Sequence, residues 1–267
     1  MKKFDEYSYG AELEYGDFNR KLASSKIAKW GVVDSNDFSV MNSDGSVGDP
    51  YNGNYGGEIV TYVNNSPEEL AESCSNIVKN LDKIDINHSC WLHIHVGVGK
   101  INDLDILTDI AQFVYLWSNY IKNNKIINSP KLDTNGNEYY LRNETRLSTM
   151  NEGEIIGCLS AQDLEEFWSH FDRKRHLINM RSIKTIGTIE YRFLAATKDK
   201  NDFLLAAKMC EEITNNILNK NDNFDIINVY SKKHKVIDMK LESLYRDNIK
   251  NIQKKPKVDN FTGILWQ

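Results

Sequence analysis

Four short stretches in which polar and apolar residues alternate constrain the fold of this chain more than any other feature. They span residues 10–16, 57–63, 90–98 and 187–193 of the 267-residue sequence. Side chains alternate between the two faces of a β-strand, so each stretch is predicted to be a strand that buries one face and uses the other differently. Such half-polar alternation is more typical of antiparallel strands with one open face than of a parallel sheet.

Segments with helical periodicity separate the predicted strands. Helices are expected at residues 66–82, 103–123, 160–171 and 202–218, with a less regular one at 238–254. The first of these begins with Ser66 as a cap, Pro67 at the first helical position and Glu69 as a capping-box partner. Turn residues predict loops at 44–50, 53–57 and 126–139. Together these elements favour an α+β fold.

Composition restricts the classes of protein to consider. Hydrophobic residues make up 40% of the chain, yet no apolar run approaches the roughly 20 residues that a membrane span needs. The first residues lack the apolar core of a signal peptide, and the four cysteines are scattered, so we expect a cytoplasmic protein with reduced thiols. A net charge of −5 argues against general nucleic-acid binding.

The charged residues of the four stretches would share one face if the strands lay side by side. That face would carry Glu12, Glu14, Glu58, His93, His95, Glu190 and Arg192. Several carboxylates in one site repel one another unless cations compensate, and oxygen ligands with imidazole suit Mg²⁺ or Mn²⁺. Two such ions can bridge nucleotide phosphates. Beside them, the planar guanidinium of Arg192 could donate two hydrogen bonds to phosphate or carboxylate oxygens. The pattern therefore predicts a site for phosphoryl transfer.

Each motif taken alone has a more ordinary interpretation. A single Glu-x-Glu is usually a solvated strand face, and a His-x-His pair is ambiguous between a metal site and plain surface. A Glu-x-Arg pair is usually a cross-strand ion pair that contributes little to stability. The site hypothesis depends on all of them occurring together in apolar-alternating strands flanked by glycines.

The order of these motifs resembles the amidoligase family. Along the chain come Gly-x-Glu-x-Glu, Asp-Gly-Ser, Gly-Gly-Glu-Ile-Val-Thr, His-x-His-x-Gly, Asn-x-Arg and Thr-Ile-Glu-Tyr-Arg-Phe, and the resemblance extends from Gly10 to about Leu218. The family is a branch of the carboxylate-amine ligases, which include glutamine synthetase and glutamate-cysteine ligase. The resemblance implies a glutamine-synthetase-like fold, with a curved, mainly antiparallel sheet, helices packed on its outer face and a concave active-site face. Residues 1–220 would form this catalytic domain, and 221–267 a C-terminal helical extension packed on it.

The resemblance also implies an activity and roles for single residues. The activity is ATP-dependent formation of an amide bond through an acyl phosphate, with two Mg²⁺ or Mn²⁺ ions. By analogy, one ion is bound by Glu12, His93 and Glu190, and the other by Glu14 and Glu58. His95 is expected near the nucleotide phosphates, Arg192 at the transferring phosphoryl group, and Arg181 as a weaker phosphate or substrate contact. Asp44 is either a base for the incoming amine or a residue that shapes its loop.

Other functions remain open from sequence alone. A phosphotransferase of the same fold, like the guanidino kinases, would stop at a phosphorylated product, and a non-catalytic relative would only bind nucleotide. The expected substrates are a small-molecule or peptide carboxylate and an amine, which could be an amino acid, a peptide terminus, a polyamine or, in a phage-like setting, a modified nucleobase. The longer arginine-rich segment of glutamine synthetases is not found here, so ammonia and glutamate are not assumed. A homo-oligomer would be compatible with the larger relatives.

Overall fold

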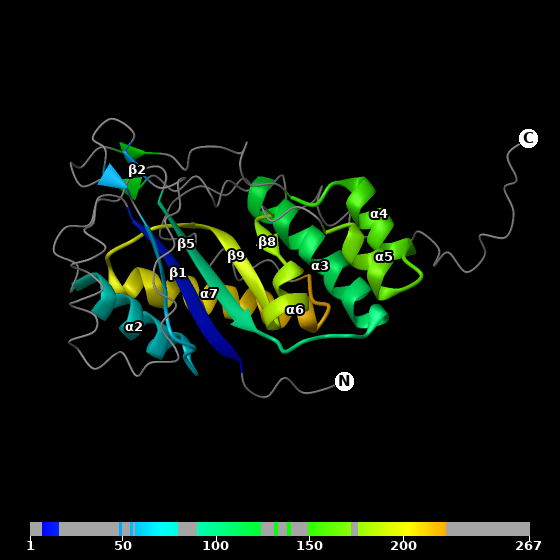
Figure 1. Ribbon diagram of the computed structural model, residues 1–267, viewed down its shortest axis with the longest axis horizontal. Helices are drawn as coiled ribbons and strands as arrows, with labels where there is room; N and C mark the ends of the chain where they lie inside the picture. The colour runs from blue at the N-terminus through cyan, green and yellow to red at the C-terminus, as the bar shows by residue number, and fades with distance from the viewer. Residues whose placement is uncertain are drawn as a thin grey trace, which may run out of the picture.

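A five-stranded antiparallel sheet lies at the centre of the computed structural model (Figure 1). The strand order is β4-β1-β5-β9-β8. The strands are β1 (Ser8–Tyr15), β4 (Gly57–Val60), β5 (Trp91–Gly97), β8 (Ile178–Asn179) and β9 (Thr188–Ala195). The structure describes residues 7–15, 48–49, 54–55, 57–79, 90–123, 131–132, 138–139, 149–171 and 176–222. The α+β class and all four predicted strands are confirmed, whereas β8 is too short to show an alternating pattern.

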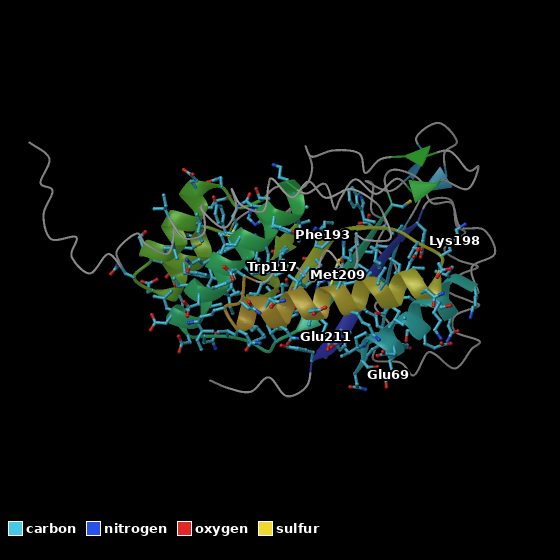
Figure 2. All side chains as sticks on the ribbon, turned by 180° about the vertical axis from the view of Figure 1, so that it is seen from behind. Glu69, Trp117, Phe193, Lys198, Met209 and Glu211 are labelled. Atoms are coloured by element: carbon cyan, nitrogen blue, oxygen red, sulfur yellow. The ribbon has the colours of Figure 1, made fainter. Side chains whose placement is uncertain are left out.

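Two helices cover the apolar face of this sheet. Helices α2 (Pro67–Lys79) and α7 (Lys200–Leu218) pack against each other and against the sheet. Helix α7 lies behind the strands in Figure 1 and in front of them in Figure 2, which is seen from behind. The Tyr191 hydroxyl, which is fully buried, lies 2.6 Å from Thr214 Oγ1 of α7. Burial of apolar strand residues against these helices leaves the opposite, polar face for other uses.

The remaining helices form a group at one end of the sheet (Figure 1). Helix α3 (Leu104–Asn123) packs against α4 (Glu152–Ser160) and α7, and α4 packs against α5 (Leu164–Ser169). The short helix α6 (Arg181–Ile186) packs against β9. Within the part of the chain that is described, none of these helices is long and apolar enough to cross a membrane.

One helix prediction is wrong and another is shifted. The segment 160–171 is not one helix, because α4 ends at Ser160 and α5 begins at Leu164. Asp163 caps α5 by accepting the backbone N–H of Glu166, at 2.9 Å. Helix α7 begins two residues earlier than predicted because Asp199, whose side chain accepts the N–H of Asn201, is its cap. Satisfying the first N–H groups of a helix defines its start more strongly than apolar periodicity does.

Several predictions fall on segments with little or no described structure. Two short strand pairs lie in segments predicted as loops, namely β2 (Gly48–Asp49) with β3 (Asn54–Tyr55) and β6 (Lys131–Leu132) with β7 (Glu138–Tyr139). The expected helix at 238–254, and all of the expected extension beyond residue 222, lie outside the described residues. The division into residues 1–220 and 221–267 therefore stays a prediction.

Candidate active site

Strand register brings the charged residues of the polar face into adjacent positions. Glu12 of β1 lies opposite His93 of β5, and on the other side of β5 His95 lies opposite Glu190 of β9. Opposed residues in an antiparallel pair have Cβ atoms about 5 Å apart, which puts these side chains within contact distance. The edge strand β4 adds Glu58, which lies opposite Glu14 of β1.

The Glu12 carboxylate is the point that both histidines share. Its Oε2 atom lies 2.8 Å from His93 Nδ1, and its Oε1 atom lies 3.1 Å from His95 Nε2. Burial tends to raise the pKa of Glu12, but hydrogen bonds to the two imidazoles outweigh burial and hold that pKa well below its usual range. Glu12 is therefore a carboxylate that keeps its charge inside a half-buried cluster.

The two histidines are both held in place, but their pKa values are shifted in opposite directions. Burial is the main cause that lowers the pKa of His93, although the hydrogen bond to Glu12 opposes it. Burial also acts to lower the pKa of His95, but Glu12 and Glu190 together outweigh it, so this pKa is raised. The other ring nitrogen of His95, Nδ1, lies 3.0 Å from Thr188 Oγ1. A neutral imidazole is the form that binds a metal ion.

Glu190 is 5% exposed, and hydrogen-bond donors contact both of its carboxylate oxygens. Asn179 Nδ2 donates to Oε2 at 2.6 Å, and Arg192 Nη1 donates to Oε1. His93 Nδ1 lies 3.8 Å from the same Oε1 atom. Within the described residues the buried Nε atom of Arg192 has no hydrogen-bond partner.

The pairing of β5 with β9 is irregular beside these side chains. Leu92 pairs with Leu194 whereas Ile94 pairs with Tyr191, so β9 has one residue more than β5 in this interval. Such a bulge bends and twists the strand, and bulges are frequent next to active sites. Here the irregularity lies at His93 and Arg192, two of the predicted site residues.

Among the residues that the structure describes, two groups of side chains could hold a metal ion. Glu12, His95 and Glu190 form one, and Glu12, Glu58 and His93 form the other, with the donor atoms of each group within 4.8 Å of one another. Carboxylate oxygens with imidazole nitrogens suit Mg²⁺ or Mn²⁺, so these residues fit the predicted ions. The resemblance assigns His93 to the ion that Glu12 and Glu190 bind. The distances instead place His95 with Glu12 and Glu190, and His93 with Glu12 and Glu58. Glu14 borders the second group, since its Oε1 atom lies 3.6 Å from His93 Nε2.

The remaining candidates lie at or beyond the edge of this cluster. Arg181 is the first residue of α6 and is half-buried, and its backbone N–H donates to Asn179 Oδ1 at 3.0 Å. Asp44 lies outside the described residues. Sequence reasoning missed Asn179, although it is the first residue of the Asn-x-Arg motif, and gave no role to Thr188. An asparagine side chain often accepts the backbone N–H two residues further along the chain, as Asn179 does at Arg181, and this was the available signal.

Comparison with known protein families identifies the family of this chain. A family model described as "Putative amidoligase enzyme" matches residues 6–214, a stretch that contains all five strands of the sheet and every charged residue described above. No curated protein matches the chain. The matched stretch covers well over half of the sequence, and the chain belongs to the amidoligase family, whose name denotes a ligase-type enzyme.

Proposed function

We propose that this protein is an ATP-dependent ligase that joins a carboxylate to an amine, on a glutamine-synthetase-like fold and with two Mg²⁺ or Mn²⁺ ions. The observation that carries the proposal is the position of Glu12, whose two oxygens contact two histidines and which belongs to both groups of donor atoms. A carboxylate shared between neighbouring donor groups is what a two-ion site needs.

The charge of the polar face supports the presence of cations. Glu12, Glu14, Glu58 and Glu190 lie on neighbouring strands, and Glu14 and Glu190 are buried. Buried carboxylates are costly unless opposite charges and hydrogen bonds compensate. Bound divalent ions would neutralise these groups and the phosphates of a nucleotide. Arg192, whose partly exposed guanidinium lies beside Glu190, would contact the phosphoryl oxygens.

The proposed reaction has two steps that need no protein nucleophile. An oxygen of the substrate carboxylate attacks the γ-phosphorus of ATP, the bond from that phosphorus to ADP breaks, and an acyl phosphate forms. The amine nitrogen then attacks the acyl carbon, phosphate leaves, and the amine proton passes to a base. The sequence leaves Asp44 open either as this base or as a residue that shapes its loop, and Glu58 is the carboxylate at the edge of the described cluster. Protein groups contribute by positioning and by neutralising charge.

The amine acceptor and the carboxylate donor are proposed only as classes. A small molecule or a peptide supplies the carboxylate, and an amino acid, a peptide terminus, a polyamine or a nucleobase derivative supplies the amine. In this scheme His95 and Arg181 contact the nucleotide, while His93 joins Glu12 and Glu190 at one ion. His93 Nδ1 lies closer to Glu12 than to Glu190, at 2.8 and 3.8 Å.

The test is ATP consumption with Mg²⁺ over a panel of carboxylates and amines, with mass spectrometry of the products. We expect an amide together with ADP and phosphate. Glu190→Gln removes one ionised ligand at nearly constant shape and should lower the rate by about a hundredfold or more. Glu165→Gln, an exposed glutamate of α5, is the matched control and should keep the wild-type rate.

Three results would contradict the proposal. A phosphorylated acceptor that accumulates without any need for an amine would identify a kinase of the same fold. Absence of binding of Mg²⁺-ADP in a calorimetric titration would exclude both the ligase and the kinase. Amide formation that survives Glu190→Gln would mean that the chemistry takes place away from this face of the sheet.

A further inference from the structure

Asn179, at the end of the edge strand β8, contacts two parts of the candidate site through a single amide group. Its Nδ2 atom donates to Glu190 Oε2 at 2.6 Å, and its Oδ1 atom accepts the backbone N–H of Arg181 at 3.0 Å. Strands β8 and β9 lie side by side, with Asn179 opposite Glu190 (Figure 1). The amide therefore joins a carboxylate of the site to the first residue of α6.

The orientation of this amide is determined by its partners. A carboxylate oxygen can only accept a hydrogen bond from Asn179, and a backbone N–H can only donate one. With the amide turned over, oxygen would face oxygen at Glu190 and an NH₂ group would face the N–H of Arg181. Both contacts would then be repulsive, so the NH₂ group has to face Glu190.

The asparagine is itself held firmly. It is 6% exposed, and its backbone carbonyl accepts a hydrogen bond from Ser182 Oγ at 3.0 Å. The donor that meets Glu190 is thus fixed by the β8–β9 pairing and by the first turn of α6. Hydrogen bonds to a buried, ionised group are stronger than those between neutral groups, and their loss is correspondingly costly.

We propose that Asn179 is a positioning residue, which holds Oε2 of Glu190 so that Oε1 alone is presented to a metal ion. Oε1 is the oxygen that lies near His93 Nδ1, at 3.8 Å, and that accepts from Arg192. Glu190 then binds its ion through one oxygen, in a fixed direction. The inference rests on the proposed function, since it takes Glu190 to be a metal ligand.

Mn²⁺ binding to the purified full-length protein tests this role without relying on turnover. The probe is Mn²⁺ alone, and free Mn²⁺ is measured by electron paramagnetic resonance in the absence of nucleotide. Asn179→Leu keeps the approximate volume but removes the donor, and should weaken Mn²⁺ binding by about tenfold, as is typical when the partner of a metal ligand is lost. Wild-type affinity in this variant would overturn the proposal.

Two further variants separate positioning from folding. Asn179→Ser retains an oxygen that can cap the N–H of Arg181 but is too short to reach Glu190, so it should also bind Mn²⁺ more weakly. Ser182→Ala removes the other hydrogen bond at the start of α6 and leaves the amide in contact with Glu190. It should lower thermal stability slightly while Mn²⁺ affinity stays at the wild-type value. Weakening of Mn²⁺ binding by Ser182→Ala equal to that by Asn179→Leu would show a general structural effect and overturn the proposal.

A double-mutant cycle shows whether Asn179 acts through Glu190. In a Glu190→Gln background the Asn179→Leu change should alter Mn²⁺ affinity by less than about twofold, because the carboxylate that it positions is gone. A further tenfold loss there would mean that Asn179 acts by another route. Wild-type Mn²⁺ affinity in Glu190→Gln alone would remove Glu190 from the metal site, so that the proposed function, and with it this inference, would fail at that step.

Discussion

His93 and His95 are two residues apart on β5 and contact the same carboxylate, yet their surroundings differ. His93 is 3% exposed and lies within 4 Å of three glutamates, Glu12, Glu14 and Glu190. His95 lies nearer the end of the strand, between Glu12 and the hydroxyl of Thr188. Surrounding carboxylates favour a metal ion at His93, whereas His95 has a neutral group on one side.

The two histidines should therefore respond differently to replacement. We expect His93→Gln to weaken Mn²⁺ binding by about tenfold or more, and His95→Gln to leave it within about twofold while weakening the binding of Mg²⁺-ADP. Calorimetric titration of each variant with Mn²⁺ and then with Mg²⁺-ADP measures both effects. Equal loss of Mn²⁺ binding in both variants would contradict this division and make His95 a ligand, as its distance from Glu12 and Glu190 would allow.

The identity of the charged residues was predictable from sequence because each alternates with buried apolar neighbours. Glu12 and His93 belong to different stretches, and nothing within either stretch reveals that they lie opposite each other. Strand register is decided by the packing of the apolar face and by the turns, so it becomes visible only in the folded sheet. Asn179 was missed for the same reason, since its partner Glu190 is on a different strand.

At the scale of elements, the junction between α6 and β9 is a tightly constrained stretch of backbone near the site. Gly187 ends α6 with a φ of 77°, and its carbonyl accepts the N–H of Val98, which follows β5. A Cβ atom at Gly187 would lie 2.9 Å from the carbonyl carbon of Gly99. The left-handed conformation and the close approach of the second chain segment both require glycine.

Gly187→Ala should consequently destabilise the protein more than an alanine substitution at a left-handed glycine without close neighbours. Gly99 has a nearly equal φ of 76°, but a Cβ atom there would meet nothing within 4 Å, so Gly99→Ala is a matched control. We expect a loss of about 1 kcal/mol for Gly99→Ala and about 2 to 3 kcal/mol for Gly187→Ala, from strain plus the steric clash. Urea denaturation followed by circular dichroism measures both, and equal losses would contradict the role of the clash.

The helices show which local sequence signals determine where a helix begins and ends. Helix α4 contains Gly153 and Gly157, which weaken its periodic pattern, but its start is marked by a complete capping box between Asn151 and Glu154. Apolar periodicity alone does not predict this helix. Helices α2 and α3 were predicted well because long apolar repeats and clear caps agreed.

At the scale of the whole molecule, the reactivity of the four cysteines can show whether the protein unfolds cooperatively. They are buried and form no disulfide, and they come from α2, the residue before β5, α4 and α7. Burial, with a contribution from Glu154, raises the pKa of Cys158 to about 12. At pH 8 such a thiol is almost entirely protonated and unreactive, since the thiolate is the nucleophile.

All four thiols should react together when the protein unfolds. Because α3 packs against both α4 and α7, we expect the helices at the end of the sheet to unfold with the sheet itself. Labelling with an aromatic disulfide reagent along a urea gradient should follow the circular dichroism transition at every cysteine, as mass spectrometry of peptides can show. Labelling of Cys158 at lower urea concentrations than Cys210 would instead reveal an independent unit of α4 and α5.

The strand order has a consequence for biosynthesis. The Tyr15 hydroxyl, at the end of β1, donates to the carbonyl of Thr197, 182 residues later, and β5 is paired on one side with β1 and on the other with β9. During translation β1, β4 and β5 leave the ribosome well before β9, and the free edge of β5 is open to pairing with other chains in the meantime. The strand that finally covers this edge is also the one that brings Glu190 and Arg192. A nascent chain therefore brings together the charged residues of the candidate site at the same moment as it loses its exposed edge.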